Sequence, residues 1–579
     1  MIKIHKILFA SLALLLTATV FSCKKVVDKI PDDGGVVNLD TANSTWADRL
    51  YDSVFLYADQ IYYWEDKLPT YENFLPRKYK TSDTLKGLQN EVFQITRFAK
   101  DASGRSYEQA IDYNQYGERV DDNRQAKFSY IVYTKDTKNG GAVSNVIVNN
   151  DFTKNLKMTL DGKENNFGFV LGFIPAKYSY GTADSIDATK VDSNSYVSFV
   201  RFITKESPAY HAGMRRGDYV TKINGMIAND DNIDAIVTAL DGDHIDVVTY
   251  KPSTKVQKNY SINKTTYQFD PFFKDTVVTI TSPNNNVTKK IGYAAYKSFT
   301  EFDSSSKEPL ERVINRFTSE GIEDLVIDLR YNGGGSVFTA QNFIDYVAPT
   351  SANGKVMMTN YYNKLMQDKK ATILKNLPQR DDNDKPISGK TYFDYDYSVS
   401  ANTDRVTKQG SLNLPRVYFI VSSSSASASE MMINSLKPFM NVTLIGASFS
   451  DNGSRTYGKP IGFFEVRMGP ENNSVSMWIS NFETKNANGE GGYYDGMTTN
   501  YQAFDDIRYD LGDPRERSFR QAIRLILGDN AYTPPVSMSR SGGSIRARSN
   551  QEDNFMKGVR GIAVGAVTNI HDMVIDPAK

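Results

Sequence analysis

The sequence predicts a multi-domain α/β (α+β) protein. The chain has 579 residues, which is more than one hydrophobic core usually serves, so several domains are expected. Apolar residues make up 40% and charged residues 23%, an ordinary composition for a globular protein. In the second half, apolar strands run into glycine- or serine-rich turns and then into helical spacing, at 325–347 and again at 416–436. This alternation is typical of a sheet covered by helices on both faces.

The charge balance and the rare residues exclude several classes of function. Lys+Arg and Asp+Glu both number 68, so the formal net charge is zero, which argues against a general nucleic-acid binder. One cysteine excludes an intramolecular disulfide and a cysteine-based metal cluster. The four histidines are too scattered for a histidine-built metal site, and no cofactor is expected.

The first 22 residues have the pattern of an export signal. Lys3 and Lys6 precede an apolar run, 7–21, which is too short to span a bilayer comfortably and ends just before Cys23. This arrangement resembles a bacterial lipoprotein signal, although Phe21 departs from its tightest form. The resemblance implies a lipidated Cys23 that ties the chain to a membrane of the cell envelope, on the periplasmic side or the cell surface. The alternative is a generic signal peptide with an incidental cysteine. Residues 23–43 are polar and read as a tether.

Residues 44–134 show apolar side chains at helical spacing. Trp46, Leu50 and Val54 lie on one such stripe. The pattern predicts an N-terminal helical domain, and it carries no catalytic constellation.

The block at 165–255 alternates strand and turn signals. Ser207 can cap a short helix that begins at Pro208, Gly213 can end it, and 219–223 and 245–250 read as strands. The run 207–225 resembles the PDZ domain. That resemblance implies that an extended peptide adds to a sheet edge, beside a glycine-containing loop whose candidates are Phe167, Gly168 and Phe169. The alternative is a domain that serves only as a spacer.

The block at 288–534 carries the chemistry. We expect strands at 290–296, 325–329, 416–421 and 442–445, and a helix over 309–317 that begins at a proline. Glycines 333–335 leave backbone N–H groups approachable, which suits an oxyanion site. Small residues in 422–430 allow a serine hydroxyl to project from a strand-to-helix turn.

Three motifs of this block, at 328–335, 425–430 and 456–459, together resemble the S41 peptidases, the C-terminal processing proteases. The resemblance implies Ser427 as nucleophile and Lys459 as general base. It also implies an oxyanion hole built from the backbone amides of Ala428 and of Gly334 or Gly335. The implied substrates are unfolded or C-terminally exposed protein segments.

The residue inventory agrees with a lysine base. No histidine occurs between His244 and His571, so a Ser-His-Asp triad has no source for its base. A lysine must be neutral to act, which requires its pKa to fall by roughly 3 units, on the order of 4 kcal/mol. Two departures from the family pattern stand out. Extra residues in 447–454 lengthen the Ser427-to-Lys459 spacing, and Phe463 stands where some members carry a lysine-orienting glutamine.

Three other interpretations compete with a protease. The run 453–459 matches the start of a phosphate-binding loop, but Pro460 replaces the required Ser or Thr, which excludes an ATPase. A catalytically degenerate relative could bind peptides in the envelope, and the same fold could hold a small hydrophobic ligand. The tail, 535–579, begins Ser-, Arg- and Gly-rich and is predicted to be flexible. The sequence therefore favours a lipid-anchored serine endopeptidase that acts on protein or peptide substrates.

Overall fold

The computed structural model describes residues 44–113, 119–134, 161–175, 196–251, 254, 256–381, 385–447, 455–469, 474–503, 505–534 and 560–564. The chain divides into two compact units, 1–43 and 44–579, and every described residue belongs to the second. The export signal, Cys23 and the tether lie outside the described residues. Across the described ranges, no helix combines the length and apolar character needed to span a bilayer.

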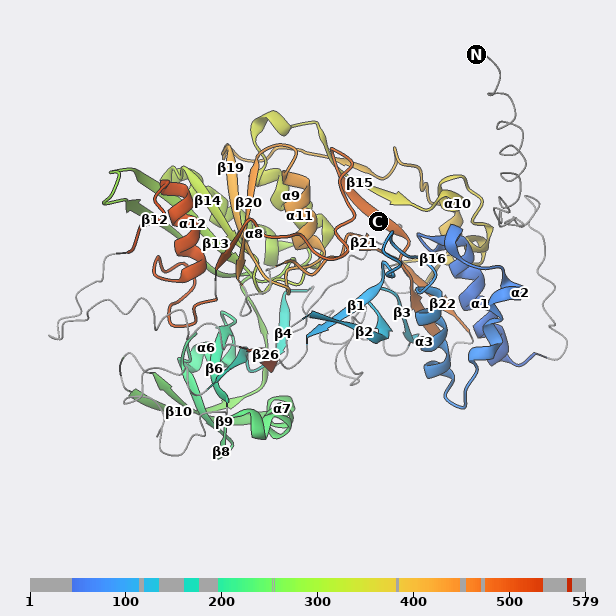
Figure 1. Ribbon diagram of the computed structural model, residues 1–579, viewed down its shortest axis with the longest axis horizontal. Helices are drawn as coiled ribbons and strands as arrows, with labels where there is room; N and C mark the ends of the chain where they lie inside the picture. Colours follow the sequence, from blue (N-terminus) through green and yellow to red (C-terminus); the bar gives the residue numbers. More distant parts are fainter. Residues whose placement is uncertain are drawn as a thin grey trace, which may run out of the picture. The chain divides into compact units, whose positions relative to one another are not determined.

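A six-stranded sheet forms the centre of the 288–534 block. Its order is β12-β13-β14-β19-β20-β25, and all neighbours are parallel except the β12–β13 pair (Figure 1). The four strands expected from the sequence are β13, β14, β19 and β20, and they are confirmed. The six strands are β12 (Phe272–Thr281), β13 (Thr288–Tyr296), β14 (Asp324–Asp328), β19 (Arg416–Val421), β20 (Asn441–Ala447) and β25 (Tyr501–Ala503).

Helices cover both faces of this sheet, as the apolar strands require. Alternate strand residues point to opposite sides: Ile327 and Phe419 join one buried cluster, whereas Val326 and Tyr418 join the other. The first cluster is covered by α8 (Ser304–Glu320), α9 (Val337–Val347) and α11 (Ala428–Leu436), and the second by α12 (Arg517–Leu527) (Figure 1). The central strands β14 and β19 are accordingly buried, apart from Arg416 at the start of β19.

Helix α8 corrects one expectation. It begins at Ser304 rather than at Pro309, which lies inside it. The carboxylate of Asp303 accepts from Ser305 N and caps the helix one turn earlier than the proline would have done.

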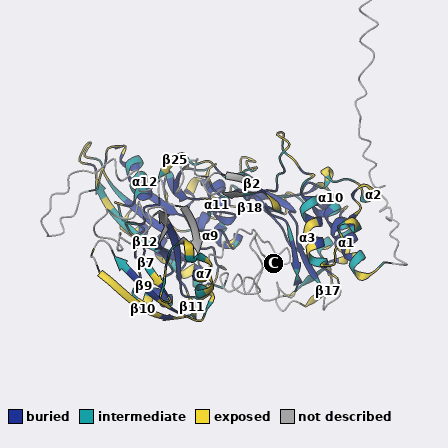
Figure 2. Ribbon diagram, turned by 60° about the horizontal axis from the view of Figure 1, so that its bottom comes forward, coloured by how far each residue is buried: buried dark blue, intermediate teal, exposed yellow. Residues whose placement is uncertain are grey.

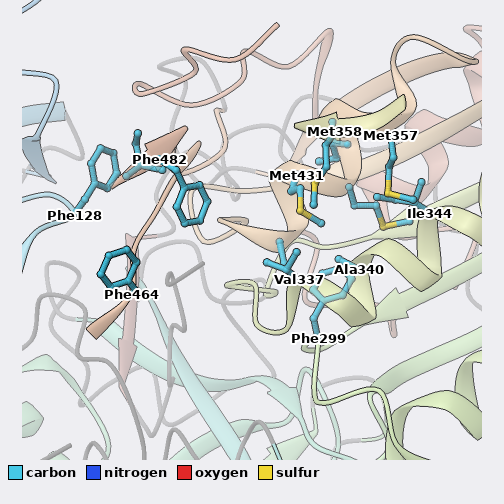
Figure 3. Close-up of a cluster of buried hydrophobic side chains, with 14 of the residues drawn as sticks. Phe128, Phe299, Val337, Ala340, Ile344, Met357, Met358, Met431, Phe464 and Phe482 are labelled. Atoms are coloured by element: carbon cyan, nitrogen blue, oxygen red, sulfur yellow. The ribbon is translucent and has the colours of Figure 1, made fainter. Parts of the chain in front are cut away.

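The segment 44–134 is helical only in its first part. Helices α1 (Trp46–Ile61), α2 (Tyr71–Phe74) and α3 (Thr84–Ile95) are followed by strands β1 (Gln109–Tyr113), β2 (Arg119–Ala126) and β3 (Tyr130–Tyr133). Strand β3 pairs with β23 (Val475–Trp478), far along the chain. The side chains of α1 and α3 share one buried cluster with α9 and α11. Figure 3 shows other members of this cluster, among them Phe128 from the N-terminal segment together with Phe464 and Phe482. This segment is therefore built into the core of the later block.

A separate sheet is formed by residues 169–263 and one strand from the tail. Its order is β10-β9-β7-β6-β5-β26, with β8 beside β7. The capped helix α6 (Pro208–Ala212) and strand β7 (Tyr219–Ile223) lie where the sequence places them, and Gly213 ends α6 with φ 95°. Strand β10 extends past the predicted boundary at 255 and is mostly exposed (Figure 2). The other elements are β5 (Phe169–Pro175), β6 (Tyr196–Ile203), β8 (Met226–Ile227), α7 (Ile233–Asp241), β9 (His244–Lys251), β10 (Val256–Asn263) and β26 (Arg560–Val564).

The remaining elements are short and complete smaller sheets around these two. They are β4 (Lys163–Asn166), β11 (Thr265–Gln268), β15 (Val356–Tyr362), α10 (Lys364–Gln367), β16 (Pro378–Arg380), β17 (Pro386–Thr391), β18 (Thr403–Arg405), β21 (Ile461–Gly462), β22 (Glu465–Met468) and β24 (Phe482–Asn486). Of the tail predicted to be flexible, 560–564 form β26, and the rest of 535–579 lies outside the described residues.

Candidate active site

Ser427 occupies a strained position between strand β19 and helix α11. Its φ is 56° and its ψ is −117°, a conformation that residues other than glycine rarely adopt. Such strain costs on the order of 1–3 kcal/mol and gathers at functional sites. The side chain is fully buried, directly ahead of the first turn of α11.

The Ser427 hydroxyl differs from those of its neighbours in the serine run. Ser425 Oγ donates to Leu329 O at 2.7 Å, Ser429 Oγ donates to Asn332 O at 3.0 Å, and Ser422 Oγ donates to Arg330 O. Ser427 Oγ is buried without a hydrogen-bond partner among the described residues. A buried polar atom with no partner is uncommon in folded proteins and requires an explanation. Of these four hydroxyls, only that of Ser427 is available for chemistry.

The glycine turn after β14 lies directly against Ser427. A Cβ on Gly334 would lie 2.9 Å from Ser427 Cβ and 3.2 Å from Ala428 N, and its φ is 112°. A Cβ on Gly335 would lie 2.1 Å from Phe299 O. Because glycine has no Cβ, the backbone at Gly334 can lie directly against the backbone of the serine turn at 426–428. The structure thus brings Ser427, Ala428 and Gly334 into one place.

Two backbone amides beside Ser427 are candidate donors to an oxyanion. Ala428 N belongs to the first turn of α11, where amides have no acceptor within the helix. Gly334 N donates to Asn332 Oδ1 at 2.8 Å in this conformation. The Asn332 side chain is held in turn by Tyr296 O, to which its Nδ2 donates at 3.1 Å.

The carboxylate of Glu430 joins the serine turn to the segment that carries Lys459. Its Oε2 accepts from Ser427 N at 3.1 Å and from Lys459 N at 2.8 Å. Its Oε1 accepts from Thr456 Oγ1 at 2.5 Å and from Gly458 N at 2.7 Å. Burial raises the pKa of Glu430, and these hydrogen bonds and the charge of Lys127 oppose that rise. One buried carboxylate therefore fixes both partners of the predicted dyad through their backbone.

Lys459 is buried, with 1% of its surface exposed. Its Nζ lies 4.7 Å from the centre of the Phe463 ring and 6.0 Å from that of Phe128. Phe463 stands where some members of the S41 family carry a glutamine, so an aromatic face flanks the amine there. A ring face attracts a cation, so these two aromatic contacts do not by themselves favour the neutral amine that a general base requires.

A second buried lysine comes from the N-terminal segment. Lys127 Nζ donates to Tyr457 O at 2.9 Å and to Tyr494 O at 2.5 Å. It thereby holds the loop just before Lys459. The sequence analysis assigned no role to Lys127, Phe128, Glu430 or Thr456. Glu430 and Thr456 lie inside the motifs at 425–430 and 456–459, and Glu430 also stands at the third position of a helix, where acidic residues are common. Nothing in the sequence marked Lys127 or Phe128.

A buried network of charged side chains surrounds Arg330, which precedes the glycine turn. The Arg330 guanidinium binds Asp328 and donates to Asp505 Oδ1 at 2.9 Å and Glu516 Oε1 at 3.0 Å. Arg216, from the β5–β10 sheet, donates to the same Asp505 oxygen at 2.5 Å. Burial alone would raise the pKa of Asp505, but Arg216 and Arg330 hold it well below its usual range. This network also links the two large sheets.

The predicted peptide-binding loop lies immediately before β5. Gly168 has φ 85°, and a Cβ there would come 1.9 Å from Ser207 Cβ. Its carbonyl accepts from Thr204 N at 2.8 Å, and Phe167 O accepts from Ala209 N at 3.0 Å. The Phe167 and Phe169 side chains are core residues, 3% and 5% exposed. Any contact of this loop with a peptide would therefore come from its backbone.

One family model matches part of the later block. Residues 290–493 match the family model "Peptidase family S41", a range that contains Ser427, Lys459, Gly334 and Glu430. This part of the chain is thus similar to the S41 peptidases, and the name of one relative describes a serine protease.

Two curated proteins illustrate the likeness. "Probable CtpA-like serine protease" of Staphylococcus saprophyticus is 25% identical over 257 residues, which is 44% of this chain and 41% of that protein. "Carboxy-terminal processing protease CtpB" of Bacillus subtilis is 26% identical over 145 residues, 24% of this chain and 28% of that protein. The chain thus spans less than half the length of the curated relatives it matches. A solved structure assigned to the S41 proteases, from Bacteroides fragilis, is 19% identical with a TM-score of 0.47, covering 84% of this chain and 97% of its own.

Proposed function

We propose that this chain is a serine endopeptidase that uses a Ser427–Lys459 dyad. The observation that carries the proposal is the buried, unpartnered hydroxyl of Ser427, which lies in strained backbone against Gly334 and Ala428. A buried carboxylate also fixes Lys459 to the same turn. The substrates would be unfolded or C-terminally exposed protein segments, and the reaction needs no cofactor.

The proposed reaction has two halves. Ser427 Oγ attacks the scissile carbonyl carbon while neutral Lys459 takes the hydroxyl proton. The carbonyl π electrons move to oxygen, which the amides of Ala428 and of Gly334 or Gly335 stabilise. The C–N bond then breaks as Lys459 returns the proton to the leaving amine. Water repeats the sequence on the acyl-enzyme, which releases the acid and restores Ser427.

We also propose that the β5–β10 sheet is a PDZ-type domain that binds substrate or gates access to the site. Gly168 before β5 and the capped helix α6 support this assignment. The lipoprotein pattern of residues 1–23 supports export and a lipid anchor at Cys23, at the periplasmic side or the cell surface. Membrane fractionation of cells that produce the full chain tests the anchor.

The test of the activity is cleavage of an unfolded model protein by the purified full chain, beside the same protein in its folded state. Cleavage confined to the unfolded form supports the proposal. The rival interpretation is a catalytically degenerate relative that binds peptides. The presence of Phe463 in place of an orienting glutamine favours this rival. Binding of unfolded protein without any cleavage would select that rival.

Replacement of Gly334 by alanine should reduce kcat by about 10²-fold or more. The new Cβ would press on Ser427 Cβ and Ala426 O, and it would disturb an oxyanion donor. Gly354→Ala is the matched control, because Gly354 also has a positive φ, 75°, but no atom within 4 Å of the added Cβ. Steady-state cleavage of both variants is the measurement. Equal activities would show that Gly334 serves backbone conformation alone.

Replacement of Glu430 by glutamine should lower kcat by roughly 10–100-fold with little change in KM. The amide nitrogen cannot accept, so two of the four N–H and O–H donors around it lose their acceptor. Glu430 is thus a positioning residue. Glu490→Gln, at an exposed site, is the control, and a KM rise with unchanged kcat would contradict the assignment.

A further inference from the structure

A strand from the tail lies at one edge of the β5–β10 sheet. Strand β26 (Arg560–Val564) pairs antiparallel with β5, whose other neighbour is β6 (Figure 1). Among the described residues, β5 pairs with no third strand. Without β26, therefore, β5 would be an edge strand with a row of unpaired N–H and C=O groups.

The β5 edge has the features of a strand-addition site. It begins directly after the Gly168 turn, whose backbone is fixed by Thr204 N and by the close packing of Ser207. Every residue of β5 is paired with β6 on its other side, with one register shift between Val170 and Leu171, so the strand is held in an extended form. An edge of this kind binds peptides through main-chain hydrogen bonds.

The ladder between β26 and β5 is short and irregular. Every residue of β5 has a partner in β6, whereas β26 has matched partners only for Arg560 and Val564, with a register shift between them. Between the two matched pairs, β26 advances by four residues, from 560 to 564, whereas β5 advances by only two, from 173 to 171. The ladder therefore contains a bulge. Glycine at 561 also weakens a strand. A second strand of better register could therefore replace it.

We propose that residues 560–564 are a resident strand of this chain that occupies the β5 edge, and that an extended segment of a polypeptide substrate binds by displacing it. The inference rests on the proposed function, which makes the competitor a substrate polypeptide. A tethered strand competes at an effective concentration of order millimolar, so it lowers the apparent affinity of any peptide added from outside.

The test measures peptide binding in the full chain carrying Ser427→Ala, which separates binding from cleavage. The probe is a fluorescein-labelled synthetic peptide with the sequence of residues 556–567, followed by anisotropy. Ile562→Pro places a proline, which disfavours strand pairing, in the middle of the resident strand, and Ile545→Pro places the same change in the tail ahead of it. We expect Ile562→Pro to bind the probe about tenfold more tightly, for a tether concentration of order 1 mM and an intrinsic Kd of about 100 μM. Ile545→Pro should match the parent.

Equal binding by both variants, or no binding by either, would overturn the proposal whether or not the chain is a peptidase. Hydrogen exchange provides a measurement without a proline variant. In the parent chain, the amides of 560–564 should exchange slowly, and excess probe should remove that protection. Unprotected exchange in the parent chain would contradict a resident strand, while cleavage of an unfolded protein would still test the activity separately.

Discussion

Ser427→Ala should reduce kcat for an unfolded model protein by about 10³-fold or more, while the folded chain remains intact. Loss of the attacking oxygen removes the covalent step, and other parts of such a site do not replace it. The substitution removes a buried hydroxyl that has no partner in the described structure, so we expect no loss of stability. The activity assay measures the loss of kcat, and thermal melting of the same protein measures whether its stability is unchanged.

Ser429→Ala is the matched control for this prediction. It lies two residues away on the same turn, but its hydroxyl donates to Asn332 O and has a structural role. We expect it to lose about 1 kcal/mol of unfolding free energy and to keep activity within a few-fold of the parent. The reverse pattern, an active Ser427→Ala and an inactive Ser429→Ala, would show that the nucleophile is misassigned.

Lys459→Met should reduce kcat by a similar factor. Methionine has nearly the same length and suits the buried site against Phe463 and Phe128, so the chain should still fold, but it cannot accept the Ser427 proton. Lys437→Met, at the exposed end of α11, is the control and should cleave normally. Near-parental cleavage by folded Lys459→Met would exclude Lys459 as the base.

Local signals predicted much of the fold. Ser207 caps α6 and Gly213 ends it, as their side chains and backbone freedom dictate, and β7 and β19 occupy the expected residues. The start of α8 was missed because Asp303 outcompetes Pro309 as a helix-start signal. Strand β3 was missed because its partner, β23, lies more than 300 residues later, and no local pattern records such a pairing. Strands β1 and β2 pair with each other, and they were missed because the helical expectation for 44–134 rested on spacing near its start.

One part of the candidate site could also be predicted from the sequence, and another part could not. The glycine turn and the serine turn each follow a predicted strand of one parallel sheet, so their meeting could be expected from topology. The surroundings of Lys459 could not. Lys127 and Phe128 come from the N-terminal segment, and nothing in their own neighbourhood marks them as partners of residues 457–459. They meet because the N-terminal segment shares the core of the later block.

The most direct test of the central claim is the pH dependence of cleavage of an unfolded model protein, measured for the parent chain beside Ser427→Ala from about pH 6 to about pH 10. A lysine base acts only when it is deprotonated, so activity must rise with pH as Lys459 loses its proton. A lysine that serves as general base near neutral pH must be neutral there, so the proposed role predicts a midpoint well below the ordinary lysine pKa of about 10.4. Serine-dependent cleavage with such a midpoint is the predicted result. Absence of cleavage by both folded proteins at every pH would contradict the Ser427–Lys459 enzyme and favour a peptide-binding relative.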